Sequence, residues 1–190
     1  MSGLQTMTLA DSLRTPRVSL RAMGPALASA FFHLIDGDRS HLGATMAWVE
    51  TLECVADQEE RLRKAEEVRA TGDAYPFAMF EAERDALMGA VGVHHVDRER
   101  RCGELGYWIA TEFEGLGLAS EAVSGLAQAC FDAGFERLEI RCSSLNPRSS
   151  ALATRCGFAL VQRVEGSGQH PAGPSDQLVF ARTEHTQARS

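Results

Sequence analysis

Apolar residues recur along this chain with two periods, which divide it into expected strands and helices. Alternating or unbroken apolar runs predict strands at 17–22, 75–82, 87–96, 102–109, 137–144, 158–165 and 177–182. Apolar residues at helical spacing predict helices at about 27–34, 57–70, 118–133 and 148–156. Because we find no internal repeat and no linker, this order predicts a single mixed α/β domain.

The length agrees with one domain. A chain of 190 residues can bury one sizeable core and is short for two. We expect the domain to span residues 12–183, with flexible termini at 1–11 and 184–190.

Charge and composition narrow the function. The formal net charge is −7, from 19 basic and 26 acidic residues, and a net-acidic chain is a poor binder of nucleic acid or anionic membranes. No basic start precedes an apolar run, and the longest such run, 22–35, is interrupted by Pro25 and His33. Five cysteines without a C-x-x-C pair disfavour disulfides and a zinc site. We expect a reduced, cytoplasmic protein with no metal.

A glycine-containing loop between a strand and a helix is the most informative segment. In GELGYWIATEFEGLGLASEA, Gly115 and Gly117 allow a tight turn whose N–H groups lie at the positive end of the next helix. The glycines could serve only the turn, or form a dinucleotide fingerprint in which Ser120 fills the third glycine position. A third interpretation is a loop that binds the diphosphate of coenzyme A.

A second motif favours the third interpretation. Asn146 is followed by Ser149 three residues later and by Gly157 and Phe158 at the end of a short helix. Together with E-G-L-G-L-A at 114–119, this pattern resembles the GNAT superfamily of N-acetyltransferases. The phrases GELGYWI and LEIRCSSLNPRSS are most similar to its RimJ/RimL branch, which acetylates protein N-terminal α-amines. The resemblance covers about residues 16–182.

The resemblance implies a fold and a cofactor site. It implies a mixed, mostly antiparallel sheet of six or seven strands flanked by helices, with strands 102–109 and 137–144 splayed to admit acetyl-CoA. Backbone groups of Trp108, Ile109 and Ala110 would bind the pantetheine arm. The diphosphate would lie on Gly115, Leu116, Gly117, Leu118, Ala119 and Ser120. Asn146 and Ser149 would contact the cofactor or fix the loop.

One position departs from the family pattern. Glu114 stands where the family usually has Gln or Arg, which brings a negative charge near an anionic ligand. We expect Glu114 to turn outward and leave the diphosphate to backbone amides and the helix dipole.

Acyl transfer from a thioester to an amine needs a base, and Glu104 is the candidate. It interrupts an apolar strand that leads into the cleft, although it could instead be a structural carboxylate paired with Arg141. His94 and His95 are alternatives. Neighbours on a strand point to opposite faces, so only one of the two histidines would serve a cleft.

For the acid that protonates the departing thiolate, the resemblance implies Ser149. Many GNAT proteins place a Tyr seven residues after the Asn, and this chain has Ala153 there. Ser149 could instead cap the helix. Cys142 has no evident activating base, so we expect direct transfer in a ternary complex and no acetyl-cysteine.

The leading interpretation is an acetyl-CoA-dependent N-acetyltransferase. Its acceptor would be a protein N-terminus or a small amine; the alternative is a non-catalytic module that binds acyl-CoA. Residues 49–85 hold 11 acidic and 5 basic residues, which could attract a cationic acceptor or form an ordinary solvated surface. Homodimers are common among similar proteins, so the resemblance also allows a homodimer.

Overall fold

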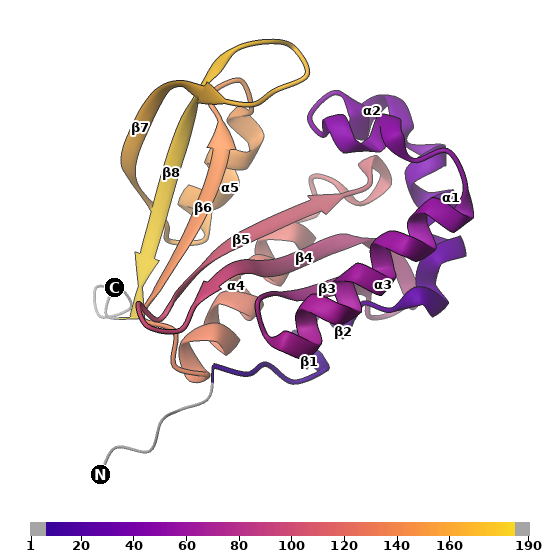
Figure 1. The fold of residues 1–190 in the computed structure, drawn as a ribbon, viewed down its shortest axis with the longest axis horizontal. Helices are drawn as coiled ribbons and strands as arrows, with labels where there is room; N and C mark the ends of the chain where they lie inside the picture. The colour runs from indigo at the N-terminus through magenta and orange to yellow at the C-terminus, as the bar shows by residue number, and fades with distance from the viewer. Residues whose placement is uncertain (1–6, 185–190) are drawn as a thin grey trace.

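One twisted sheet of eight strands forms the centre of the protein, and helices cover both of its faces (Figure 1). The computed structural model describes residues 7–184. The strands are β1 (Ser12–Arg14), β2 (Val18–Ala22), β3 (Tyr75–Glu81), β4 (Ala86–Asp97), β5 (Cys102–Ile109), β6 (Arg137–Ser143), β7 (Ala159–Gly168) and β8 (Ser175–Thr183). Their spatial order is β1-β2-β3-β4-β5-β6-β8-β7, and the β5–β6 pair alone is parallel among these neighbours.

The helices divide between the two faces of the sheet. They are α1 (Ala28–Gly37), α2 (Arg39–Gly43), α3 (Val55–Thr71), α4 (Leu118–Asp132) and α5 (Pro147–Arg155), with short 3-10 turns η1 (Pro25–Leu27), η2 (Ala47–Thr51) and η3 (Thr111–Phe113). Helices α1, α2 and α3 pack with Phe80 and Trp108, whereas α4 and α5 pack with Leu105 and Tyr107. Alternate residues of β5 therefore face different cores, as the two-residue period of a strand requires.

The sheet opens between β5 and β6. Strand β5 pairs with β4 as far as Ile109, but it pairs with β6 only over Cys102–Glu104. Beyond Glu104 the two strands diverge, and β6 continues beside β8 (Figure 1). The predicted splay is confirmed, and it leaves one edge of the outer half of β5 without a neighbouring strand.

Two short elements and the position of the last strand in the sheet were not predicted. Strand β1 and helix α2 hold three and five residues, too few for a periodic pattern. Strand β1 raises the strand count to eight, above the expected six or seven. The last strand, β8, lies between β6 and β7, an arrangement that depends on contacts distant in sequence.

The N-terminal boundary also differs from the prediction. Met7 and Leu9 belong to the core, and the Tyr75 hydroxyl donates to the Met7 carbonyl at 2.8 Å. The expectation of a flexible 1–11 segment is therefore wrong for residues 7–11, because two apolar side chains anchor them. Residues 1–6 and 185–190 of the predicted flexible ends lie outside the described residues, and the described Glu184 donates its N–H to the Glu136 carbonyl at 3.3 Å. Between residues 7 and 184, no helix is long and apolar enough to cross a membrane.

Candidate active site

The loop before α4 exposes the positive end of that helix. Gly115 and Gly117 have φ angles of +73° and +78°, which glycine adopts readily, and Gly117 is the N-cap residue. In the described part of the chain, the backbone N–H groups of Leu118, Ala119 and Ser120 have no hydrogen-bond acceptor. Three free donors at a helix N-terminus form a site suited to an anionic group such as a diphosphate.

This loop borders a first cavity of about 430 Å³ in the splay. Most of the predicted cofactor residues line it: Trp108, Ile109, Gly115, Gly117, Leu118, Ala119, Ser120, Asn146 and Ser149. The other two, Leu116 and Ala110, do not line it. The Leu116 side chain is exposed and its carbonyl accepts from Arg17, while Ala110 is buried.

The free edge of β5 follows from the strand's alternation. The Ala110 N–H donates to the carbonyl of Met88 in β4, so it already has an acceptor within the sheet. Because alternate residues direct their N–H and C=O groups to opposite edges, Ile109 directs its own toward the splay. Of the three predicted pantetheine contacts, Ile109 is thus the best placed.

Asn146 and Ser149 take different roles at the start of α5. The Asn146 side chain caps the helix, since its Oδ1 accepts from the Ser149 N–H at 3.0 Å. The Ser149 hydroxyl caps nothing and lies 2.9 Å from the Tyr107 hydroxyl. The capping role considered for Ser149 therefore belongs to Asn146, and the Ser149 hydroxyl is available for chemistry.

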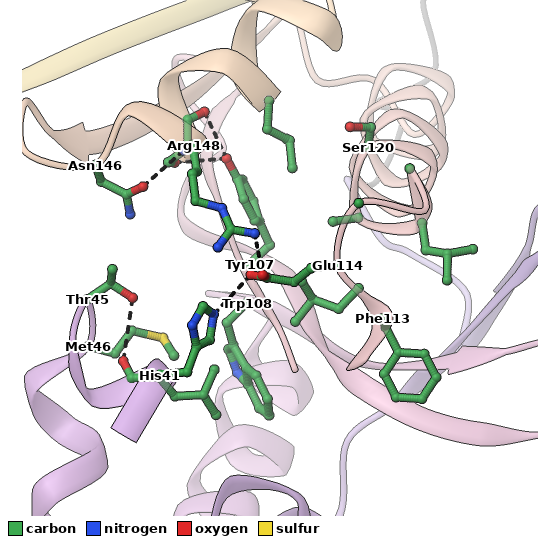
Figure 2. Close-up of a pocket in the computed structure, with 18 of the residues that line it drawn as sticks. His41, Thr45, Met46, Tyr107, Trp108, Phe113, Glu114, Ser120, Asn146 and Arg148 are labelled. Carbon is green, nitrogen blue, oxygen red and sulfur yellow. Dashed lines mark hydrogen bonds and ion pairs between the residues drawn. The ribbon is translucent and has the colours of Figure 1, made fainter. Parts of the chain in front are cut away.

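Tyr107 is a site residue that the sequence analysis missed. Its hydroxyl contacts Ser149 Oγ and also donates to the Ser149 carbonyl at 3.2 Å (Figure 2). Burial raises the pKa of Tyr107 to about 12, although the hydrogen bond to Ser149 acts in the opposite direction. Tyr107 therefore keeps its proton at neutral pH. The phrase GELGYWI contains this tyrosine, but the pattern carried no sign that it meets Ser149.

A second cavity, of about 570 Å³, adjoins the first. Glu104, Arg141 and His170 line it, and both cavities share Thr45, Tyr107, Asn146 and Ser149. The two cavities therefore meet at the Tyr107–Ser149 pair. We call the two cavities together the passage: the anion-binding loop lines one of them and Glu104 lines the other.

Glu104 both lines a cavity and forms an ion pair with Arg141, the two environments that the sequence predicted for it. Its side chain is 30% exposed and lines the second cavity, and its Oε2 lies 3.4 Å from Arg141 Nε. Arg141 also pairs with Glu139 at 2.7 Å. The ion pair is thus present, while the carboxylate still faces the cavity.

A β-bulge lies at the two candidate histidines, His94 and His95. The register of β4 and β5 shifts after His94, and His95 has a φ of +49°. The His95 Nδ1 lies 3.4 Å from Glu104 Oε2, and the His94 ring packs over Gly106, two residues along from Glu104 on the same face. His95 lines the second cavity and His94 lines neither, so one histidine of the pair serves the cleft, as expected. Burial lowers the pKa of His94, and His95 lowers it further.

His170 is a second residue that the sequence analysis missed. Its Nδ1 accepts from the Ala172 N–H at 3.1 Å, so the proton of the neutral ring is on Nε2. Nε2 is buried, and within residues 7–184 it has no hydrogen-bond partner. The residue lines the second cavity, and this buried N–H is a donor that lacks an acceptor.

Glu114 lies inside the first cavity, so the prediction that it turns outward is wrong. Its side chain is 19% exposed, hydrogen-bonds His41 of α2 at 3.0 Å and forms an ion pair with Arg148 of α5. Figure 2 shows the carboxylate between the imidazole and the guanidinium. Contacts with His41 and Arg148 hold the carboxylate inward, and the sequence pattern did not reveal them.

Cys142 lines the second cavity. Among the described residues, its thiol has one hydrogen-bond partner, the Ser150 hydroxyl at 3.5 Å. A hydroxyl is not a base that activates a thiol, so this environment favours no acetyl-cysteine. Cys130 and Cys156 are buried, and burial raises the pKa of each thiol.

The splayed sheet, the anion-binding loop and the capped α5 helix agree with one class of protein. A model of the acetyltransferase (GNAT) domain matches residues 17–159. The chain belongs to the GNAT family and is an acetyl-CoA-dependent N-acetyltransferase, not the non-catalytic binding module that its sequence also allowed.

Individual relatives agree with the RimL/RimJ branch, as predicted. The ribosomal-protein-serine acetyltransferase of Escherichia coli (strain K12) is 24% identical over 157 residues, which cover 82% of this chain and 84% of that protein. The structure of RimL, a ribosomal L7/L12 α-N-protein acetyltransferase, in complex with coenzyme A has a TM-score of 0.85 at 19% identity, covering 90% and 97% of the two chains. MccE, a microcin C7 self-immunity acetyltransferase, in complex with acetyl-CoA and AMP gives 0.84 at 22% identity, covering 89% and 93%.

Proposed function

We propose that this enzyme transfers an acetyl group from acetyl-CoA directly to a primary amine while both substrates are bound. The observation that carries the proposal is the meeting of two cavities at Tyr107 and Ser149. The cofactor would enter on the side of the anion-binding loop, and the amine on the side of Glu104. Holding the two at one junction lowers the entropic cost of bringing the reacting atoms together.

The chain's own groups fit acetyl-CoA along the first cavity. The free N–H groups of Leu118, Ala119 and Ser120 would hold the diphosphate. The open edge of β5 at Ile109 would bind the amides of the pantetheine arm as an added strand does. The thioester would then lie near Ser149, at the end of the arm.

On the amine side, Glu104 would act as the base. An amine must lose a proton before its lone pair can attack the thioester carbon, and Glu104 would accept that proton directly or through a water molecule. Arg141 and His95 lie within 3.4 Å of the carboxylate and orient it. The amine gains the acetyl group, and the carbon–sulfur bond of the thioester breaks.

Ser149 would donate a proton to the departing thiolate. The Tyr107 hydroxyl contacts Ser149 Oγ at 2.9 Å, and its high pKa keeps it a donor. When the Tyr107 proton turns from the Ser149 carbonyl to Ser149 Oγ, the Ser149 proton is free to turn toward the sulfur. Tyr107 is therefore a positioning residue for Ser149, and it compensates for the tyrosine that Ala153 replaces.

The acceptor would be a protein N-terminal α-amine or a small-molecule amine. The second cavity offers the Glu104 carboxylate to an ammonium group and the His170 Nε2–H to a carbonyl oxygen. An α-amine beside a peptide carbonyl matches this pair of groups. The name of RimL favours the α-amine of a ribosomal protein, and that of the E. coli relative also names a ribosomal protein. MccE is named for immunity to microcin C7, which points to a different acceptor.

A free-thiol assay tests this function. Thiol released from acetyl-CoA would be measured over a panel of N-terminal peptides, amino-acid amides and simple amines, with N-acetylated peptides as the control. We expect amine-dependent release and an acetylated product, and none with the blocked peptides. Release that is equal with and without amines would overturn the proposal.

A further inference from the structure

Three side chains from different elements meet across the first cavity. His41 comes from α2, Glu114 from the loop before α4, and Arg148 from the first turn of α5. His41 Nε2 lies 3.0 Å from Glu114 Oε1, and Arg148 forms an ion pair with the other carboxylate oxygen. In Figure 2 the Arg148 side chain reaches from α5 toward the loop and ends at Glu114. We call these three residues the Glu114 cluster.

We infer that Arg148 is a phosphate-binding residue of the cofactor site and that Glu114 holds it in the free enzyme. The diphosphate of the cofactor would displace the Glu114 carboxylate and take Arg148 as its own partner. This inference rests on the proposed function, since it assumes that the cofactor enters the first cavity.

The position of Arg148 supports this exchange. Its guanidinium contacts Glu114, the residue just before Gly115, so it already lies beside the loop whose free N–H groups face the cavity. The Arg148 side chain is 61% exposed, and Glu114 is its one charged partner among residues 7–184. An exposed guanidinium with one partner can turn to a new one, and its planar fork matches a phosphate as well as a carboxylate.

Electrostatics explains why Glu114 must release its partner. A carboxylate that is 19% exposed in the cavity lining repels a diphosphate, and screening by salt is weaker there than on an open surface. His41 remains in contact with Glu114 after Arg148 turns away. The carboxylate therefore keeps a hydrogen-bond partner during the exchange, which lowers the cost of releasing Arg148.

The exchange predicts that Glu114 weakens cofactor binding. We expect Glu114→Gln to bind coenzyme A about tenfold more tightly, because the amide keeps the shape and loses the charge. We expect Arg148→Gln to bind it about tenfold more weakly. Because the two residues act through one ion pair, the gain from Glu114→Gln should be smaller in the double variant.

Isothermal titration of coenzyme A and of pantetheine, which lacks the diphosphate, tests the inference. The four proteins are the wild type, the two single variants and the double variant. Glu112→Gln is the matched control, since Glu112 is an exposed carboxylate of the same segment outside the cavity lining. We expect both effects with coenzyme A, neither with pantetheine, and no change in the control. Thermal unfolding would confirm that each variant is folded.

Two outcomes would overturn the inference while the proposed function stands. One is that Glu114→Gln binds coenzyme A equally or more weakly, and the other is that Arg148→Gln binds it as the wild type does. If the wild type binds no coenzyme A at all, the proposed function fails together with the inference. The same titration therefore separates the two failures.

Discussion

At the scale of single residues, the proposed mechanism depends on the hydroxyl pair formed by Tyr107 and Ser149. We expect Ser149→Ala to lower kcat about 100-fold, because the thiolate loses its proton donor. The Kd for coenzyme A should change little. Tyr107→Phe should lower kcat less, since Ser149 keeps its hydroxyl and loses only its orientation. Steady-state kinetics and calorimetry measure the two quantities.

Ser150→Ala is the matched control for this prediction. Ser150 is the next residue of α5, and its hydroxyl contacts Cys142 and the Asn146 carbonyl, not Tyr107. Its kcat should stay near the wild-type value. A wild-type kcat in Ser149→Ala would show that the hydroxyl pair has no part in proton transfer.

The proposed role of Glu104 as the base predicts how the rate depends on pH. A carboxylate base must be ionised to accept a proton, so a rate that depends on it should fall in acid. In Glu104→Gln we expect kcat to drop about 100-fold and this acidic limb to disappear. Glu139→Gln is the control, because Glu139 pairs with Arg141 but does not line the second cavity. An unchanged pH profile in Glu104→Gln would assign the base elsewhere.

The proposed hydrogen bond from His170 predicts that acceptors with a carbonyl group react more efficiently. If its Nε2–H binds an acceptor carbonyl, His170→Leu should lower kcat/KM for an amino-acid amide about tenfold, the usual effect of one lost hydrogen bond. Activity with an amine of similar size without a carbonyl should be unaffected. His170→Gln places an amide N–H near the same point and should restore most of the activity. Equal losses on both amines would rule out this contact.

Single residues also show what sequence can predict. Ser149 was predicted from the family resemblance and Glu104 from an interrupted apolar strand, and both residues line a cavity. Tyr107 and His170 were missed because their significance depends on partners 42 and 2 residues away that the pattern does not pair. Glu114 was noticed but placed wrongly, since its inward orientation depends on His41 and Arg148 from two other elements.

At the scale of elements, the cap of α5 controls the position of Ser149. Asn146 accepts from the Ser149 N–H, so it fixes the first turn that carries the hydroxyl. Asn146→Ala should cost about 1 kcal/mol of stability and also lower kcat. Asn146→Asp keeps the acceptor and should retain stability. Chemical denaturation gives the stability of each variant, and Asn146→Ala as stable as the wild type would contradict the capping role.

The elements themselves were largely predictable, and their arrangement was not. Strands β3 to β6 and helix α4 are long enough for periodicity to reveal them. The splay between β5 and β6 came from the family resemblance, since no local pattern reports where two strands separate. The place of β8 beside β6 and the bulge at His95 depend on pairing between distant segments, which one-dimensional patterns do not encode.

At the scale of the whole molecule, the uneven charge has a smaller role than its sequence pattern suggested. Neither cavity is lined by a residue of the acidic segment 49–85. Several of its carboxylates pair locally, as in Glu59 and Glu60 with Arg63, and Glu81 with Arg84. The carboxylate that faces the amine side is Glu104, from β5. Attraction of a cationic acceptor is therefore expected from the passage itself.

The central claim is that the acetyl group crosses the passage at Tyr107 and Ser149 without first binding to the protein. A single-turnover reaction tests it most directly. It uses acetyl-CoA that carries a label in its acetyl group and is quenched at successive times. We predict that label leaves the cofactor and enters the amine at the same rate, with none on the protein at any time. Label that appears transiently on the protein, for example on Cys142, would contradict direct transfer.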